Sequence, residues 1–197
     1  AVPVGSRHEA LGEYGCAHFL EHVLFKGTDK YPGVDDVNRA ILKHGGSINA
    51  YTTHEVTNFH AHIPATQEAL HDAIRVLASM VTEPDLPKDA VTREVAVVQQ
   101  EIAKYKDMPD RLVYDKMIQH ATGQEHSLGS HTISAEADDV ANFDADTARA
   151  FMERHYDKGL LTIAAPLERE VIQQVADEVM GEFKNMKRVE RLADVIN

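Results

Sequence analysis

The spacing of apolar side chains along the chain predicts that helices are its main regular structure. Leu70, Ile74, Leu77 and Val81 recur every three or four residues in the stretch 67–81, which places them on one face of a helix. Similar spacing, with glycine, proline and capping residues at the ends, predicts further helices. These cover residues 15–25, 34–43, 88–104, 109–118, 144–156 and 168–183.

Alternation of apolar and polar residues predicts an adjacent pair of strands. Residues 58–63 alternate within the strand predicted at 56–63, and residues 47–53 precede it as a neighbouring strand. A short apolar run at 160–164 is typical of a buried strand. The strands are paired with runs of helices and do not alternate with single ones. This order favours an α+β fold, in which a mainly antiparallel sheet is covered by helices on one face.

The composition is that of an ordinary globular chain and excludes several classes of function. Its 197 residues are 43% hydrophobic and 26% charged, which suffices to bury a core. The net charge of −12 argues against a nucleic-acid partner, because such a partner needs a basic surface. No apolar run approaches the roughly 18 residues of a membrane span, and no glycine-rich phosphate loop occurs. With one cysteine, any bound zinc must rest on histidine and carboxylate ligands.

The pentapeptide His18-Phe19-Leu20-Glu21-His22 carries the clearest chemical pattern. On a helix, His18 and His22 are one turn apart, so both imidazoles project from the same face and suit two ligands of one tetrahedral Zn²⁺. Glu21 lies beside the metal without needing to bind it, where a carboxylate can accept a proton from metal-bound water. The order H-x-x-E-H is the inverse of H-E-x-x-H and marks the inverted-motif zinc peptidases. Taken alone, the pentapeptide is also compatible with a solvated helix face that carries two histidines.

A catalytic zinc needs a third protein ligand, and two glutamates are candidates. Glu94 and Glu101 are seven residues apart, which places them two turns apart on one face of the helix predicted at 88–104. One carboxylate would reach the metal, while the other would hold the N–H of a ligand histidine or steady the ligand glutamate. The spacing does not choose between them, and either residue alone is compatible with a surface glutamate.

Around these residues the chain resembles the pitrilysin-type zinc metallopeptidases, in particular N-terminal domains of the mitochondrial-processing-peptidase type. The stretch GCAHFLEHVLFKGT at 15–28 is similar to the family's active-site helix. The stretches GSRHE at 5–9 and GSINAYT at 46–52 resemble the strand end before that helix and the family's Asn-Ala-x-Thr strand. Further matches follow in the family's order, so the resemblance covers nearly the whole chain. They are the glutamate helix with Val113-Tyr114-Asp115, then Leu128-Gly129, Phe143, Tyr156 and the run 160–164.

The resemblance implies a role for each residue at a matching position. His18, His22 and Glu101 would be the zinc ligands, and Glu21 would be the catalytic base. Glu94 would then hold a ligand in place without binding the metal.

The resemblance also implies how a peptide would bind. In this family the substrate adds as a strand to an exposed sheet edge, so backbone groups at Asn49 and Ala50 would bind the peptide backbone.

The same resemblance predicts the organisation of the domains. Residues 1–187 would form the zinc-bearing N-terminal domain, without the first strand that such domains usually carry, and residues 188–197 would form a polar tail or the start of a linker. The family encloses its substrate between two similar halves. The chain would therefore need a second homologous domain or subunit, and would be weakly active or inactive alone. The missing strand would expose a sheet edge and make a homo-oligomer possible.

The alternative function is that of a noncatalytic interaction subunit with the same fold. Relatives of that kind often lose their ligands, whereas all four residues of the predicted centre are intact here. A purely structural zinc domain would leave Glu21 without a role. The sequence therefore favours a zinc-dependent endopeptidase domain acting on a peptide, and assigns neither a cleavage preference nor a compartment.

Overall fold

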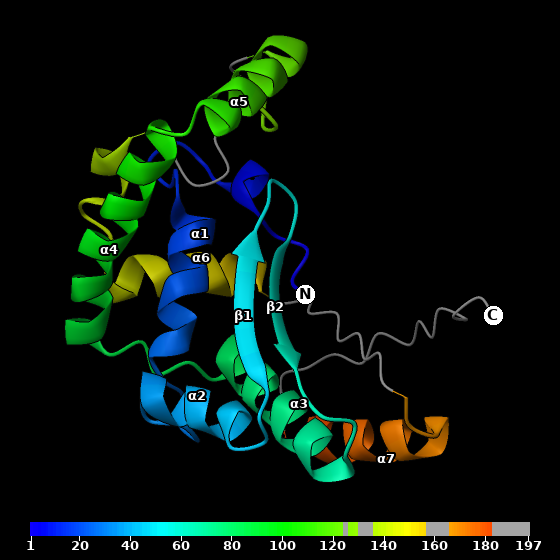
Figure 1. The fold of residues 1–197 in the computed structure, drawn as a ribbon. Helices are drawn as coiled ribbons and strands as arrows, with labels where there is room; N and C mark the ends of the chain where they lie inside the picture. Colours follow the sequence, from blue (N-terminus) through cyan, green and yellow to red (C-terminus); the bar gives the residue numbers. More distant parts are fainter. Residues whose placement is uncertain (124–125, 130–135, 157–165, 183–197) are drawn as a thin grey trace.

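The computed structural model describes residues 1–123, 126–129, 136–156 and 166–182, and every structural statement below concerns these residues. The strand predicted at 160–164 and the tail at 188–197 lie outside them. The main elements follow the chain as seven helices and two strands within the described ranges (Figure 1). They are α1 (Cys16–Val23), α2 (Val34–Leu42), β1 (Ser47–Thr52), β2 (Thr57–His62), α3 (Gln67–Thr82), α4 (Lys88–Lys106), α5 (Pro109–Thr122), α6 (Ala145–His155) and α7 (Arg169–Met180).

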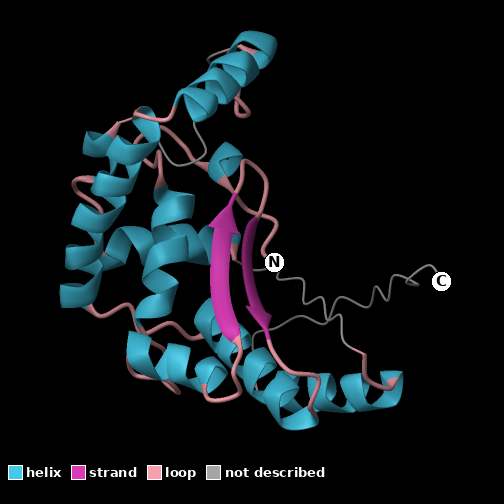
Figure 2. Cartoon of the chain, viewed as in Figure 1, coloured by secondary structure: helices cyan, strands magenta, loops and turns pink. Residues whose placement is uncertain are grey.

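The sheet is small, and helices make up most of the described structure (Figure 2). β1 and β2 pair in an antiparallel ladder in which Ser47 lies opposite His62 and Thr52 lies opposite Thr57. Val2 and Thr57 exchange two backbone hydrogen bonds, of 2.8 and 3.0 Å, which adds one bridge to β2. The predicted antiparallel pair is therefore confirmed. The predicted mainly antiparallel sheet covered by helices is found only in part, since the described residues hold a two-stranded sheet and are mostly helical.

Helix α1 lies in the interior of the molecule, beside β1 and α4, with α6 crossing it (Figure 1). Its apolar side chains have no solvent exposure, and Phe19 packs edge to face on Phe143 with ring centroids 5.4 Å apart. Because apolar side chains on more than one side of this helix are buried, α1 is held from several directions. The helix that carries the sequence motif is thus one of the most firmly packed in the fold.

The ends of α1 depend on backbone conformations that favour glycine. Gly15 precedes the helix with φ of 89°, and Gly27 follows it with φ of 139°. Between them the predicted helix divides, because α1 ends at Val23 and a 3₁₀ turn, Leu24–Lys26, continues to Gly27. The Glu9 carboxylate accepts hydrogen bonds from the amides of Gly15 and Ala17, at 2.9 and 2.8 Å. It thereby caps the first turn of α1 from outside the helix.

The remaining helices support this centre to different degrees. α3 and α7 share a second apolar cluster, in which Leu70 and Ile74 meet Val175 and Val179. By contrast, α5 buries none of its residues and projects from the end of α4 (Figure 1). Its exposed large apolar side chains are Leu112, Val113, Tyr114 and Met117. None of the described helices combines the length and the apolar character that crossing a membrane requires.

Candidate metal centre

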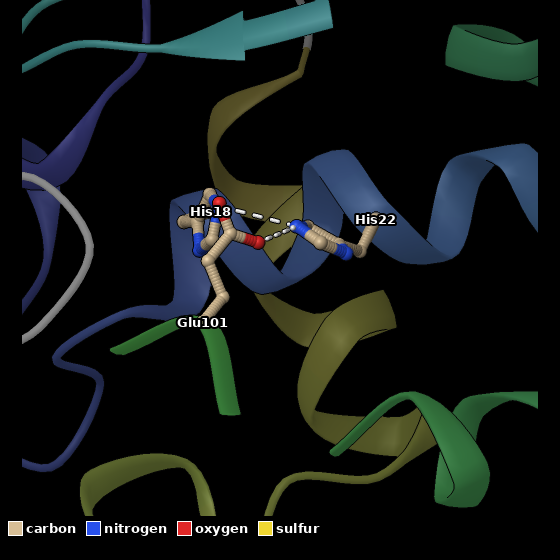
Figure 3. A group of neighbouring side chains, drawn as sticks. All are labelled: His18, His22 and Glu101. Atoms are coloured by element: carbon tan, nitrogen blue, oxygen red, sulfur yellow. Dashed lines mark hydrogen bonds and ion pairs between the residues drawn. The ribbon is translucent and has the colours of Figure 1, made fainter. Parts of the chain in front are cut away.

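Three metal-ligating side chains converge from two helices. His18 and His22 lie one turn apart on α1, and Glu101 reaches them from α4 (Figure 3). The two Nε2 atoms are 3.2 Å apart, and Glu101 Oε2 lies 3.1 Å from His22 Nε2. Glu101 Oε1 lies 3.8 Å from His18 Nε2. The fold therefore brings together residues that are separated by about eighty positions in the sequence.

These three groups fit a tetrahedral zinc ion. Zinc bonds to nitrogen and oxygen of about 2.0–2.1 Å place neighbouring ligand atoms about 3.3 Å apart, close to the distances between the three side chains. Two imidazole nitrogens and a carboxylate oxygen at these distances can all turn a lone pair toward one cation, once His22 gives up its Nε2 proton. Three ligands leave a fourth position for water or substrate, as catalytic zinc sites require.

Glu94 fixes the orientation of His22. Its Oε1 lies 2.9 Å from His22 Nδ1, and its Oε2 forms an ion pair with Lys26 Nζ at 2.6 Å. A proton on Nδ1, donated to Glu94, leaves the Nε2 lone pair free for a metal. Burial raises the pKa of Glu94, but the contacts with His22 and Lys26 outweigh it and lower the pKa. Glu94 is therefore an ionised acceptor behind the ligand.

The two histidines have opposite electrostatic environments in the metal-free protein. Burial and the neighbouring His22 lower the pKa of His18 to about 4, so His18 is neutral. Burial also lowers the pKa of His22, but its bonds to Glu101 and Glu94 outweigh this and raise the pKa to about 9. The centre therefore holds one positive charge between two carboxylates, and this is the place that a metal cation would take.

Glu21 stands beside the centre and is held by the sheet. It lies on α1 between the two histidines, and its Oε2 accepts a hydrogen bond from the Thr52 hydroxyl at the end of β1. Burial raises the pKa of Glu21, against the opposing effect of the Thr52 bond. This carboxylate is therefore oriented and more basic than that of an exposed glutamate, as a proton acceptor should be.

The sequence reasoning gave no role to four supporting residues. Thr52 contacts Glu21, Lys26 contacts Glu94, and Tyr105 donates a hydrogen bond to Glu101 from one helical turn further along α4. Arg111 then stacks on Tyr105, with its guanidinium carbon 4.8 Å from the ring centroid. A signal existed for Thr52, which ends the stretch GSINAYT, and for Tyr105, which is four residues after Glu101. Lys26 likewise lies in the stretch 15–28, whereas Arg111 carried no such signal.

Asn49 and Ala50 lie in the middle of β1, outside the group of three ligands. Asn49 is exposed and Ala50 is half-buried, in agreement with the alternation along the strand. The Ala50 amide donates to the side-chain Oδ1 of Asn49, 2.8 Å away. Among the described residues β1 pairs with β2 alone, so its other edge carries no strand.

The fold and the centre together define a class of protein. A helix with H-x-x-E-H that meets a glutamate from a second helix is the arrangement of the inverted-motif zinc peptidases. Comparison with known families is more specific: residues 1–136 match the model described as Insulinase (Peptidase family M16), and the chain belongs to that family. The resemblance found in the sequence is thereby confirmed.

Relatives and solved structures agree with this assignment. An uncharacterised zinc protease of Bacillus subtilis is 32% identical over 176 residues, which cover 88% of this chain and 42% of that protein. A probable mitochondrial-processing peptidase subunit beta of Schizosaccharomyces pombe is 31% identical over 93% of this chain and 39% of its own length. Among solved structures, pitrilysin matches with a TM-score of 0.74 at 25% identity, over 100% of this chain and 21% of its own. The chain thus spans about two fifths of the two curated relatives.

Proposed function

We propose that this chain is the zinc-bearing domain of an endopeptidase that hydrolyses peptide bonds with metal-activated water. The observation that carries the proposal is the convergence of His18, His22 and Glu101, with Glu21 held beside them by Thr52. The names of the relatives, which are zinc proteases and a processing peptidase subunit, support the same chemistry. His18, His22 and Glu101 would hold the zinc ion.

Glu21 would act as the general base of this reaction. A zinc ion in such a centre polarises the scissile carbonyl and lowers the pKa of a bound water to about 7. Glu21 would accept the proton of that water at its free carboxylate oxygen, because Thr52 occupies Oε2. Glu94 and Tyr105 would keep His22 and Glu101 aligned during this transfer.

The unpaired edge of β1 would bind the substrate. A peptide added as a strand there would form backbone hydrogen bonds near Asn49 and Ala50. The side chain of Asn49 now bonds the Ala50 amide, so it would have to leave that amide to a peptide carbonyl. The strand ends at Thr52, which contacts Glu21, so a peptide on this edge would run toward the centre.

A second homologous half, as a domain or a subunit, would complete the substrate chamber. The chain covers 42% of the Bacillus subtilis relative, which leaves room for such a half. We assign residues 1–187 to the zinc-bearing domain and 188–197 to a tail or linker toward that half. Pairing through the edge that the missing first strand would expose would give a homo-oligomer.

The test is Glu21→Gln, assayed with the second half present. Zinc content, measured by mass spectrometry of the metal, should remain at wild-type level because Glu21 is not a ligand. Peptide hydrolysis should fall at least about a hundredfold, since a general base contributes roughly 10²–10⁴. Glu178→Gln, at an exposed position on α7, is the matched control and should keep full activity. Zinc binding without turnover in the wild type would favour the noncatalytic subunit, and an active Glu21→Gln would refute the base.

A further inference from the structure

A second group of metal-ligating side chains lies where α2 and α3 meet, apart from the centre described above. Ligand atoms of His44, Glu68 and Asp72 all lie within 4.8 Å of one another. We propose that these residues form a second site for a divalent transition-metal ion such as Zn²⁺, which ties the end of α2 to α3.

The backbone already presents these groups to one point. Glu68 and Asp72 are one turn apart on α3, so their carboxylates share a face of that helix. His44 follows the end of α2, where its amide donates to the Ile41 carbonyl at 3.1 Å. Its Nε2 lies 2.8 Å from Asp72 Oδ2, and both side chains are less than one fifth exposed. Two elements thus supply one nitrogen and two carboxylate ligands without a rearrangement of the backbone.

A cation already occupies part of this position. The Lys43 ammonium lies 2.7 Å from the same Oδ2 atom of Asp72, and half of the Lys43 side chain is exposed. Burial raises the pKa of Asp72, but its bonds to Lys43 and His44 outweigh it and lower the pKa, so the carboxylate is ionised. Lys43 can turn toward water and leave Asp72 to a metal, whereas His44 is held in place. Lys43 is therefore the internal competitor of the metal.

The ligand types select the class of metal. A site of one imidazole and two carboxylates suits Zn²⁺ and its transition-metal neighbours better than Ca²⁺ or Mg²⁺, which prefer oxygen alone. His71 lies beside the group without belonging to it, with its Nδ1 3.6 Å from Asp72 Oδ1. Water would complete the coordination on the exposed side of Glu68.

A metal at this second site would hold the start of β1 in place. His44 immediately precedes the Gly45-Gly46 turn from which β1 starts, while Thr52, at the other end of β1, contacts Glu21. A metal on His44 and Asp72 would therefore anchor the beginning of the strand whose end contacts the catalytic centre.

The test measures zinc per chain at set concentrations of free Zn²⁺, using the full chain after equilibrium dialysis. The wild type should bind one equivalent tightly and a second at higher free zinc. Asp72→Asn should lose the second equivalent alone, whereas Asp36→Asn should keep both, because Asp36 pairs with Arg39 outside the cluster. Lys43→Met should strengthen the second binding roughly tenfold by removing the competing charge.

Each outcome bears on the proposal. A wild type that takes up a single equivalent up to millimolar zinc, or an Asp72→Asn variant that retains two, would overturn the second site. Lys43→Met makes the test independent of any folding defect in Asp72→Asn, since it should improve binding; a Lys43→Met variant that takes up no second equivalent would identify the cluster as an ordinary ion-pair network. Circular dichroism of each variant verifies that the fold is intact.

Discussion

Glu9 shows how a single half-buried side chain outside the metal centre positions it. Its carboxylate caps the first turn of α1 through the amides of Gly15 and Ala17, next to His18. Burial raises the pKa of Glu9 to about 8, against the opposing effect of these two bonds. Burying the ionised Glu9 carboxylate therefore has a desolvation cost, which the two hydrogen bonds offset in part.

The pKa of Glu9 predicts a pH dependence of stability. The pKa is near 4.5 in the unfolded chain and about 8 in the fold, so the folded state binds the extra proton between these values. The contribution of Glu9 to the stability of the fold is therefore fully present below pH 4.5, and it is lost as the pH rises toward 8. Urea denaturation at pH 5 and pH 7.5 should show that Glu9→Gln reduces this loss by on the order of 2 kcal/mol. Equal pH profiles of wild type and variant would contradict the assignment.

Glu94 gives a second prediction at the residue scale. Glu94→Gln removes the ionised acceptor of His22 Nδ1 and should weaken zinc binding about 10–100-fold, because partners of metal ligands contribute that much. Competition with a chelator measures this. Lys26→Met is the matched control, since it removes the other contact of Glu94 and leaves His22 paired. We expect a smaller loss for Lys26→Met, and an equal loss would mean that charge alone, without orientation by Glu94, sets the affinity.

At the scale of elements, the turn between α2 and β1 fixes where the strand begins. Gly45 has φ of 73° and open space around it, whereas a Cβ on Gly46 would lie 2.5 Å from the His62 carbonyl oxygen. The close approach of Gly46 to the end of β2 sets the register of the hairpin. Each glycine is required for a different reason.

The two glycines therefore predict different costs. Gly45→Ala should lower the free energy of unfolding by about 1 kcal/mol, because alanine is disfavoured in the left-handed backbone conformation. Gly46→Ala should cost roughly 3 kcal/mol, because the backbone must move to relieve the overlap. Denaturant titration of both variants measures the difference. Equal costs, or a larger one for Gly45→Ala, would show that the turn does not constrain the hairpin as described.

At the scale of the whole molecule, the part of the chain that the structure describes leaves at least two surfaces uncovered. One is the edge of β1 that carries no strand among the described residues, and the other is α5, whose apolar side chains are exposed. Exposed apolar side chains of this kind mark surfaces that another element covers. A second half would provide that cover.

This arrangement predicts that activity depends on assembly. The chain alone should hydrolyse peptides at least about a hundredfold more slowly than the chain combined with a second homologous half, because the substrate is not enclosed and oriented. Hydrogen exchange of residues 109–122 should slow on assembly. Full activity from the isolated monomer, with unchanged exchange in α5, would refute the need for a partner.

Much of the local structure follows from short-range signals. Apolar spacing in the stretch 67–81 and the proline at the start of α5 predicted helices that the structure confirms, and Asp144 caps α6 through the Thr147 amide as expected. The division of the first helix at Val23 was not predicted. The apolar pattern continues to Phe25, but the residues before Gly27 form a 3₁₀ turn. The extent of the sheet could not be predicted either, since strand pairing depends on distant segments.

The sequence by itself limited the chemistry that we propose for the protein. One cysteine and the order H-x-x-E-H leave histidine and carboxylate as the candidate zinc ligands, and helical geometry alone aligns His18 with His22. The tertiary structure decided the different positions of Glu94 and Glu101. Both residues lie on the same face of α4, so their spacing in the sequence does not distinguish them. Packing of α4 beside α1 places Glu101 at the Nε2 atoms and Glu94 at the Nδ1 atom of His22. The physical reason is that the angle and offset between two packed helices arise from side-chain contacts across the core, which no local pattern specifies.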